Sequence, residues 1–410
     1  MNKPHTNWKK LKIEDCAEVI GGGTPSTKKK EYWDGDISWI TPKDLSNYNN
    51  RYISKGSRNI SEKGLKYSSA RLLPKNSVLL TTRAPIGYLA ISKKELATNQ
   101  GFKSLIMKNG NVPEFFYYLL KNNISKLLQY ASGTTFMELN ATNLKSIEFY
   151  IPEVKEQKRI ASILSALDDK IELNNKTNKI LEEMAQTIFK EWFINFNFPN
   201  EDGKPYKKSG GEMIDSELGK IPKGWKVITL KDIISIAKGK KPKATSDKIT
   251  EKFTMPYLTI NCYNNEATEY TEYNEKMHVK ELDIVMVMDG NAGKIFYGKE
   301  GILSSTMAKL IVEDSNLNEL VFYFLKSIEY DLMYHTVGSV IQHADKQYML
   351  NKKFCVSLDN LERLSDIFKC IRKEISLNKK ENEKLSNIRD SLLPKLMTPK
   401  GRRADGEIRV

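Results

Sequence analysis

Two long heptad repeats, 204 residues apart, constrain this fold more than any other feature of the sequence. In each repeat, apolar residues and asparagines recur at alternating steps of four and three, which is the pattern of a coiled-coil helix. The first repeat contains Ile160, Leu164, Leu167, Ile171, Asn174, Asn178, Leu181, Ala185, Ile188 and Trp192. The second contains Leu364, Phe368, Ile371, Ile375, Asn378, Asn382, Leu385, Arg389, Leu392 and Leu396. Each repeat predicts a helix that packs against a partner helix.

Both repeats carry two asparagines at the same seam positions, Asn174 and Asn178 in the first and Asn378 and Asn382 in the second. Each helix is therefore predicted to pair with its own copy in the chain. A parallel pair would separate the two ends of the intervening block by about 55 Å, whereas an antiparallel pair with pseudo-twofold symmetry brings them together. Antiparallel packing also brings Asn174 toward Asn382 and Asn178 toward Asn378. We expect these polar pairs to fix the register of the two helices.

The composition is typical of a folded protein. A chain of 410 residues with 40% apolar residues is long enough for two or three domains. The start MNKPHTNWKK is polar and basic, and no run of eighteen apolar residues occurs, so we expect a cytoplasmic protein. The four cysteines form no CxxC pair and only four histidines accompany them, so no metal site is expected.

The positive charge is unevenly distributed. Of the formal net charge of +14, the two heptad segments carry 0 and +3, so most of the excess lies in the other parts of the chain. Those parts are candidates for contact with a polyanion. A codon bias toward lysine and asparagine is an alternative explanation of the same charge.

Each heptad segment follows a block with a mixed α/β pattern. In the first block, residues 77 to 91 predict two strands joined by a tight turn, and residues 112 to 131 predict an amphipathic helix. Residues 147 to 151 predict a final strand before the long helix, which begins at a proline followed by an acid.

The second block repeats the order of the first. Residues 283 to 298 take the place of residues 77 to 91, with Gly293 at the position of Gly87. The sequence therefore predicts an α+β fold, a tandem duplication of an α/β block followed by a long helix. The predicted parts are residues 1 to 152, the first block; 153 to 199, the first long helix; 200 to 220, a polar linker; 221 to 358, the second block; 359 to 400, the second long helix; and 401 to 410, a tail.

No motif of a catalytic centre is present. The sequence contains no GxxxxGK[ST] loop for ATP, no Asn-Pro-Pro-aromatic tetrapeptide and no glycine-rich loop of the kind that holds S-adenosylmethionine. HExxH, GxSxG and kinase signatures are also missing. Asp34, Asp36, Asp283 and Asp289 form no convincing nuclease set with a lysine. We therefore predict no catalytic residues in this chain.

Polar and basic loops recur at the same places in the two blocks. The first block has GGGTPST, TPKDL, TTRAPIG and SGTTFMELN, and the second has KGKKPKA, TINCYNN, MDGNAG and GSVIQHADKQY. Arg, Lys, Asn and Gln read base edges, whereas Ser, Thr, Lys and turn amides bind phosphates. Solvated lysines and purely structural glycines are the alternative reading of each loop. The candidate DNA-binding residues are Lys43, Arg83, Thr134, Thr135, Lys240, Lys241, Lys243, Asn261, Asn291, Gln342, His343 and Lys346.

Several of these stretches resemble one protein family. YIPEVKEQKRIASILSALDDKIELNN, residues 150 to 175, resembles the central helix of specificity subunits of Type I restriction-modification systems. LSNIRDSLLPKLMTPKGR, residues 385 to 402, is similar to the C-terminal end of that family, and TTRAPIG is similar to its target recognition domains. The second copy departs from the pattern, because SLDNLERLSDIF lacks the Pro and Glu-Gln and DGNAG replaces RAPIG.

This resemblance implies a non-catalytic subunit that reads a bipartite site on double-stranded DNA. Each block would be a target recognition domain for one half of the site, and the helical pair would set the unread gap. The implied partners are two adenine-methyltransferase subunits and ATP-dependent restriction subunits, without a membrane. S-adenosylmethionine, ATP and Mg²⁺ would belong to those partners, and no cofactor is expected in this chain.

Two functions of other classes fit part of the same pattern. One is a self-sufficient DNA nuclease or methyltransferase with an unrecognised active site. The other is a structural tether whose two heads bind protein. DNA turnover by the isolated chain and the salt dependence of binding distinguish these alternatives from a DNA-reading subunit.

Overall fold

The computed structural model describes residues 8–133, 137–264, 268–338, 342–357 and 361–399. The chain forms two compact units. The first comprises Met1–Asn175 and Lys379–Val410, and the second comprises Lys176–Asn378. Each unit therefore contains one α/β block together with a part of each long helix.

Both heptad repeats form long helices, α7 (Val154–Phe189) and α12 (Leu361–Leu396). Every seam position on the two helices is buried or half-buried, as a coiled-coil interface requires. The first helix was expected to continue to residue 199, but α7 passes into a π-helical turn at Lys190–Ile194 and ends there. Phe196 has a left-handed φ of 60°, which stops the helix.

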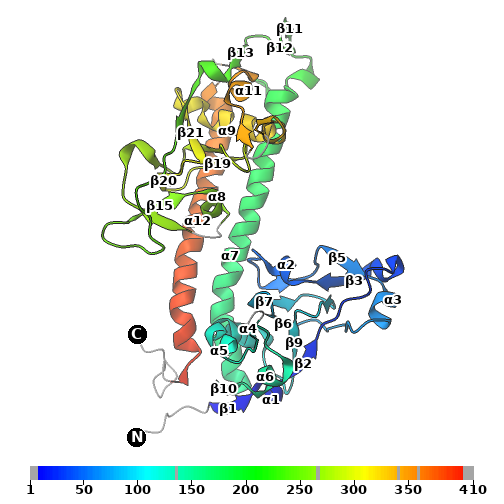
Figure 1. The fold of residues 1–410 in the computed structure, drawn as a ribbon. Coiled ribbons are helices and arrows are strands. Elements are labelled where there is room, and N and C mark those ends of the chain that lie inside the picture. Colours follow the sequence, from blue (N-terminus) through cyan, green and yellow to red (C-terminus); the bar gives the residue numbers. More distant parts are fainter. Residues whose placement is uncertain (1–7, 134–136, 265–267, 339–341, 358–360, 400–410) are drawn as a thin grey trace. The chain divides into compact units, whose positions relative to one another are not determined.

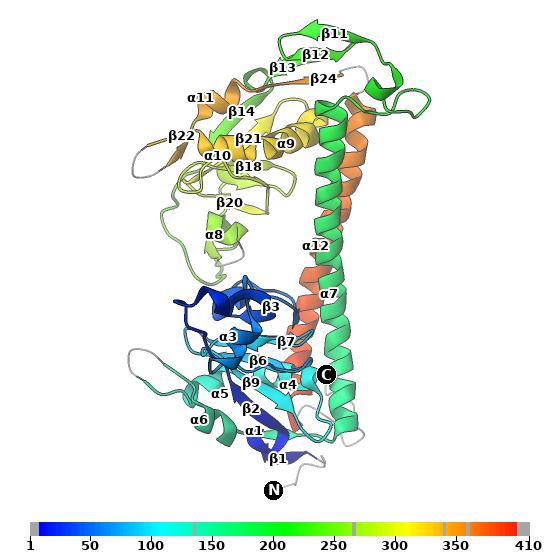
Figure 2. The same cartoon turned by 90° about the vertical axis from the view of Figure 1, so that its right-hand side faces the viewer.

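Within each unit, a segment of α7 lies antiparallel beside a segment of α12 (Figures 1 and 2). In the first unit, Arg389 Nη1 donates to Asp168 Oδ1 at 2.6 Å and Asn174 Nδ2 donates to Asn382 Oδ1 at 2.9 Å. Because the α12 residue number falls as the α7 number rises, the two segments run in opposite directions. The predicted antiparallel coiled coil is therefore confirmed.

The second unit has the same helix direction. Asn378 Nδ2 donates to Asn178 Oδ1 at 2.9 Å, and the rings of Phe189 and Phe368 lie 6.4 Å apart. The asparagines thus contact the partners expected from the sequence. Their role in fixing the register stays a prediction.

The first block contains two sheets, a five-stranded one in the order β2-β9-β6-β7-β4 and a three-stranded one in the order β5-β3-β8. A separate ladder, β1 with β10, pairs the first and last strands and so closes the block in front of α7. The strands are β1 (Lys9–Lys12), β2 (Ala17–Gly21), β3 (Trp33–Ile40), β4 (Tyr52–Ile53), β5 (Arg58–Ile60), β6 (Val78–Thr82), β7 (Ile86–Ser92), β8 (Ala97–Thr98), β9 (Lys103–Met107) and β10 (Glu148–Ile151).

Short helices connect these strands. They are α1 (Ile13–Cys16), α2 (Pro42–Leu45), α3 (Glu62–Lys66), α4 (Pro113–Lys121), α5 (Ile124–Gln129) and α6 (Ala141–Ser146). The sequence predicted a single helix over residues 112 to 131, whereas the structure has two helices there, α4 and α5, so this prediction was wrong. The chain breaks at Asn122 and Asn123, where the Asn123 side chain donates to the Leu119 carbonyl at 2.7 Å and so competes with the helical backbone bonds.

The second block repeats these pairings. The sheet β14-β21-β18-β19 matches β2-β9-β6-β7, and β16-β15-β20 matches β5-β3-β8, including the parallel pair β15 with β20. A ladder of β13 with β24 closes the block. The predicted tandem duplication is therefore confirmed. The strands are β13 (Lys226–Thr229), β14 (Ile234–Lys238), β15 (Met255–Leu258), β16 (Glu269–Thr271), β17 (His278–Val279), β18 (Ile284–Val287), β19 (Ile295–Tyr297), β20 (Gly301–Leu303), β21 (Met307–Val312), β22 (Thr336–Val337), β23 (His343–Ala344) and β24 (Lys353–Val356).

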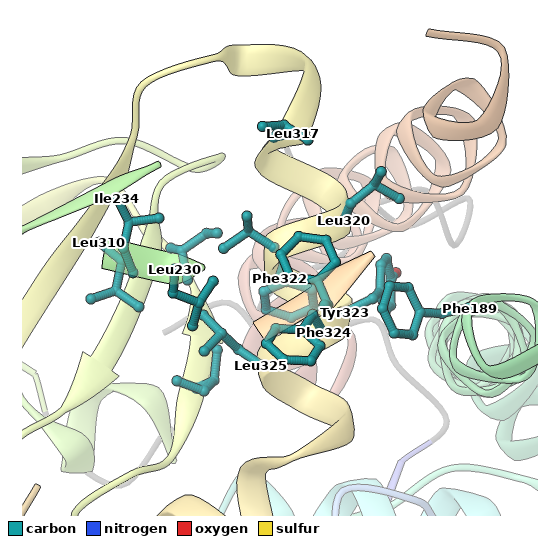
Figure 3. Packing of buried hydrophobic residues seen from close by; sticks show 14 of the residues in the cluster. Phe189, Leu230, Ile234, Leu310, Leu317, Leu320, Phe322, Tyr323, Phe324 and Leu325 are labelled. Carbon is teal, nitrogen blue, oxygen red and sulfur yellow. The ribbon is translucent and has the colours of Figure 1, made fainter. Parts of the chain in front are cut away.

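The core of the second unit lies between its sheet and the long helices. Its short helices are α8 (Ile260–Tyr263), α9 (Asn318–Ser327), α10 (Glu329–Tyr334) and α11 (Lys346–Leu350). Figure 3 shows α9 with Leu320 and Phe322 to Leu325 between the sheet residues and the helix that carries Phe189. Tyr323 lies 6.5 Å from Phe189, ring to ring. This aromatic packing attaches the second block to its part of the helical pair.

A buried ion cluster attaches the first block to its part of the helices. Asp168 on α7 accepts from Tyr118 Oη on α4 at 2.6 Å and from Arg389 on α12. Arg51, which is 2% exposed, contacts Asp168 at 3.9 Å and pairs with Asp169 and Glu172. Burial and the Asp168 charge raise the pKa of Tyr118, so its phenol stays protonated as a donor.

The segment predicted as a polar linker contains regular structure. Strands β11 (Met213–Ser216) and β12 (Gly219–Pro222) form an antiparallel hairpin that begins in this segment and ends two residues beyond it. Gly219 directly follows the turn residues Glu217 and Leu218 and has a left-handed φ of 86°, which glycine adopts without steric cost. The sequence did not predict this hairpin because the stretch is polar and β11 has no buried residue, so no alternation of apolar residues marks the strand.

Candidate nucleic-acid interface

The four candidate loops of the first block meet around residues 99 to 102. The backbone N–H groups in this region make four connecting hydrogen bonds. They are Asn99 N to Ile40 O, 2.9 Å; Gly22 N to Phe102 O, 3.3 Å; Thr82 N to Gly101 O, 2.8 Å; and Leu139 N to Thr82 O, 2.9 Å. Each loop predicted from the sequence supplies or adjoins one partner, so loops from distant parts of the chain form one surface.

The second block contains the same four connections around residues 304 to 307. They are Ser304 N to Leu258 O, 3.1 Å; Gly239 N to Met307 O, 3.0 Å; Met288 N to Thr306 O, 2.8 Å; and Ala344 N to Met288 O, 2.8 Å. The backbone frame is therefore duplicated, whereas the side chains that it carries differ between the blocks.

In the first block, the described candidate residues lie on this surface. Lys43 is exposed on α2, whose Pro42 packs against Gly101. Arg83 is half-exposed at the start of the β6–β7 loop, and Thr134 and Thr135 lie outside the described residues. A hollow of about 550 Å³ adjoins Arg83 and is lined by Arg83, Ala84, Pro85, Ile86, Leu128, Met137 and Glu138.

In the second block, all eight candidate side chains are exposed. Lys240, Lys241 and Lys243 follow β14, and Asn261 lies on α8. The other four are Asn291 in the β18–β19 loop, Gln342, His343 on β23 and Lys346 at the start of α11. Gly290 N donates to Gln342 O at 3.0 Å, which brings the loop of Asn291 beside Gln342 and His343.

The sequence did not point to Glu138, Lys103 or Lys238 on these surfaces, and it suggested Asp289 only as a possible nuclease carboxylate. Glu138 pairs with Arg83 and Lys103, and Asp289 pairs with His343 and Lys238. Strand periodicity gives no signal for such pairs, since they join segments far apart in sequence. Tyr330 and Tyr334 on α10 are 84% and 77% exposed, and their spacing of four residues on a helix was the available signal.

Two kinds of feature are absent from the described residues. No helix in them is long and apolar enough to cross a membrane. Within the same residues, no three His, Cys, Asp or Glu side chains lie close enough together to hold a metal ion.

The fold and the paired surfaces define a class of protein with two recognition blocks, each joined to part of an antiparallel helical pair. The chain belongs to the family described as "Type I restriction modification DNA specificity domain", whose model matches residues 5–183 and 222–387. The two matched regions each span one block and part of the helix that follows it.

Known relatives agree with this assignment. The chain is 36% identical to the Type I restriction enzyme MjaIX specificity subunit of Methanocaldococcus jannaschii, over 98% of this chain and 94% of the relative. It is 29% identical to the EcoR124I/EcoR124II specificity subunit of Escherichia coli over 44% of each chain. In fold, it is similar to the crystal structure of a Type I S subunit from M. genitalium, with a TM-score of 0.60, 18% identity and coverage of 97% and 98%.

Proposed function

We propose that this chain is the DNA sequence-specificity subunit of a Type I restriction-modification complex, in which each block reads one half of a bipartite site. One observation carries the proposal, namely that four hydrogen bonds gather four loops in the same way in both blocks while the exposed side chains differ. Two blocks with the same loop backbone and different exposed side chains would recognise two different DNA half-sites.

The exposed side chains are those that DNA recognition requires. Lys240, Lys241 and Lys243 provide charge for phosphates, while Arg83 and Asn291 have the donor and acceptor groups that read guanine and adenine edges. The chain would itself be non-catalytic. S-adenosylmethionine, ATP and Mg²⁺ would act in the methyltransferase and restriction subunits, and the complex would be cytoplasmic.

The helices offer a matched surface for two copies of one partner. The first unit exposes Leu173 and Ile388, and the second exposes their duplicates Leu377 and Met184. These four side chains are 47% to 57% exposed although they are large and apolar. Large exposed apolar side chains mark a site of protein contact, and each unit has one such pair. We propose that one methyltransferase subunit binds to each pair.

Replacing Leu173 and Ile388 with Asp is expected to reduce the number of bound methyltransferase subunits from two to one, because charges prevent burial of the first pair only. Native mass spectrometry of the co-expressed complex measures this number. The matched control replaces exposed Lys176 and Glu383 with Ala. Two methyltransferases bound to the Asp variant would exclude this docking surface.

DNA binding by the isolated chain is expected to weaken steeply with salt, with a slope of about −0.9 per phosphate neutralised. Changing Lys240, Lys241 and Lys243 to Gln should reduce the slope by up to about one for each phosphate that is no longer neutralised. Changing the exposed helix residues Lys155, Lys176 and Lys179 to Gln is the matched control. Fluorescence anisotropy at several salt concentrations measures both slopes.

Two outcomes would contradict the proposal. A salt-independent affinity would favour the protein-binding tether, and cleavage or methylation of DNA by the purified chain would favour the self-sufficient enzyme. Exchange of residues 1 to 152 for those of a related subunit should change one half of the site only, as seen in a map of methylated adenines.

A further inference from the structure

Each block contains a carboxylate that contacts two basic side chains on its loop surface. In the first block, Glu138 lies 4.0 Å from Arg83 Nη1 and 3.8 Å from Lys103 Nζ. In the second block, Asp289 lies 2.7 Å from His343 Nδ1 and 3.6 Å from Lys238 Nζ. The two clusters have the same composition, one acid between two basic groups.

The backbone shows that the acid and its basic partner have exchanged places. Leu139 N donates to Thr82 O in one block, and Ala344 N donates to Met288 O in the other. The residues beside these bonds form the isolated bridges Arg83 with Glu138 and Asp289 with His343. By position, Arg83 therefore corresponds to Asp289, and Glu138 corresponds to His343.

The lysines have exchanged places as well. On the pair β2 and β9, Lys103 is opposite Gly21. On the equivalent pair β14 and β21, Lys238 is opposite Ala308. The lysine that contacts the acid thus comes from one strand in the first block and from the other strand in the second. Both clusters are rebuilt from different positions with the same kinds of side chain, one acid, one lysine and a second basic group.

Stability does not account for this repetition. Lys103 and Asp289 are 16% and 21% exposed, but each pair also has a partner that is more than a third exposed, namely Glu138 at 41%, His343 at 53% or Lys238 at 47%. Ion pairs at such positions contribute little to folding, because water screens the charges and the side chains lose entropy when they pair. A role at the loop surface, where the DNA would lie, explains the arrangement better.

We infer that Glu138 and Asp289 are positioning residues, each of which orients one base-reading side chain, Arg83 in the first half-site and His343 in the second. This inference rests on the proposed function. Arg83 contacts the acid through Nη1, at 4.0 Å, which leaves its other donors for a base. An imidazole that donates Nδ1–H to Asp289 has Nε2 left for a base edge. The lysine offsets the charge of the acid, which would otherwise repel the DNA phosphates.

The exchange of positions decides which residues of the two half-sites are equivalent. Alignment by backbone position matches Arg83 with Asp289. Arginine typically contacts guanine, whereas an acid typically accepts from cytosine, so this alignment pairs residues of different base preference. The exchanged clusters instead match Arg83 with His343. Each block would then read a base with the basic partner of its acid, and the two readers would come from opposite loops.

The test uses the assembled methyltransferase complex and a map of methylated adenines. Glu138→Gln is expected to reduce discrimination at one base pair of the first half-site by roughly tenfold or more, with no change in the second half-site. Asp289→Asn should do the reverse. Glu138→Asp and Asp289→Glu, which keep the charge, should recover part of the discrimination.

A charge exchange separates positioning from simple stabilisation. The variant with Arg83→Glu and Glu138→Arg restores an ion pair, so a purely structural role predicts the original methylation motif, and that result would overturn the inference. Positioning predicts a changed base at one position, with a melting temperature close to that of the parent. Unchanged motifs in both Glu138→Gln and Asp289→Asn would also overturn the inference, while the proposed function would stand. Failure of the unaltered complex to methylate a bipartite site would instead reject the proposed function.

Discussion

Deletion of residues 175 to 181 together with 375 to 381 is expected to shorten the unread gap of the DNA site by about three base pairs. Seven helical residues span about 10.5 Å, and B-DNA rises about 3.4 Å per base pair. Both α7 and α12 continue without interruption through the deleted regions, so one heptad leaves each helix. Because the deletion removes Leu377 from the proposed docking surface, exposed Lys384, which moves into its place, is replaced with Leu. Neither half-site should then change, because no loop residue is altered. A map of methylated adenines measures the gap and both halves.

The paired deletion preserves the seam. It removes the layer of Asn178 with Asn378 but retains Asn174 with Asn382. Deletion of residues 175 to 181 alone is the control, and it should prevent folding because the remaining seam residues no longer match. A folded double deletion with an unchanged gap would refute the role of the helices as a spacer.

The remaining asparagine pair allows a test of register. Asn174, which is 3% exposed, also donates to Glu381 at 2.7 Å. Replacing Asn174 and Asn382 with Leu in the full-length chain should raise the melting temperature but produce more than one gap length, because an apolar seam tolerates shifted pairings. A single gap would show that these asparagines do not fix the register.

Replacement of Asp168 with Ala is expected to lower the free energy of unfolding of the first unit by about 3–5 kcal/mol, since Arg51, Arg389 and the Tyr118 hydroxyl all lose their one deeply buried acceptor. The carboxylate is 5% exposed and contacts Arg51, Tyr118 and Arg389. For a unit of this size, the melting temperature should fall by roughly 10 °C. Thermal unfolding monitored by circular dichroism measures the change.

Asp390 provides the matched control for Asp168. It also contacts Arg389, at 2.9 Å, but its side chain is 60% exposed, so Asp390→Ala should cost less than about 1 kcal/mol. Arg51 keeps Asp169 and Glu172 after loss of Asp168, so Arg389 is the cation that suffers most. The double variant Asp168→Ala with Arg389→Ala should therefore recover part of the stability. Equal losses from Asp168→Ala and Asp390→Ala would contradict the importance of the buried cluster.

The equivalent position in the second unit illustrates how the two copies diverged. Arg372 is the duplicate of Asp168, and its guanidinium lies over the Tyr297 ring at 3.7 Å and donates to the Glu281 carbonyl at 3.2 Å. Ala185 is the duplicate of Arg389 and is fully buried. The second block is thus attached to its helices mainly by aromatic and apolar packing. The aligned repeats show both residue differences, but they do not show which side chains these residues contact.

The sequence by itself determined the two long helices, the asparagine pairs, the antiparallel direction and the tandem duplication. These features depend on local periodicity and on the length of chain between repeats, which are both readable from the residues. The break at Asn122 and the hairpin of β11 with β12 were not predicted, since a side-chain hydrogen bond or a single turn glycine decided them locally.

Only the tertiary structure decided which loop residues act together. The sequence identified the loops and most of their exposed basic residues, yet it could not show that Glu138 meets Arg83 and Lys103, or that Asp289 meets His343 and Lys238. The residues in these contacts lie 35 to 55 positions apart in the sequence. Two of the contacts also join the partners of an isolated β-bridge, so packing of the whole block sets their geometry. An acid and its basic partner that exchange places keep their contact, and this exchange becomes visible only when both partners are seen together.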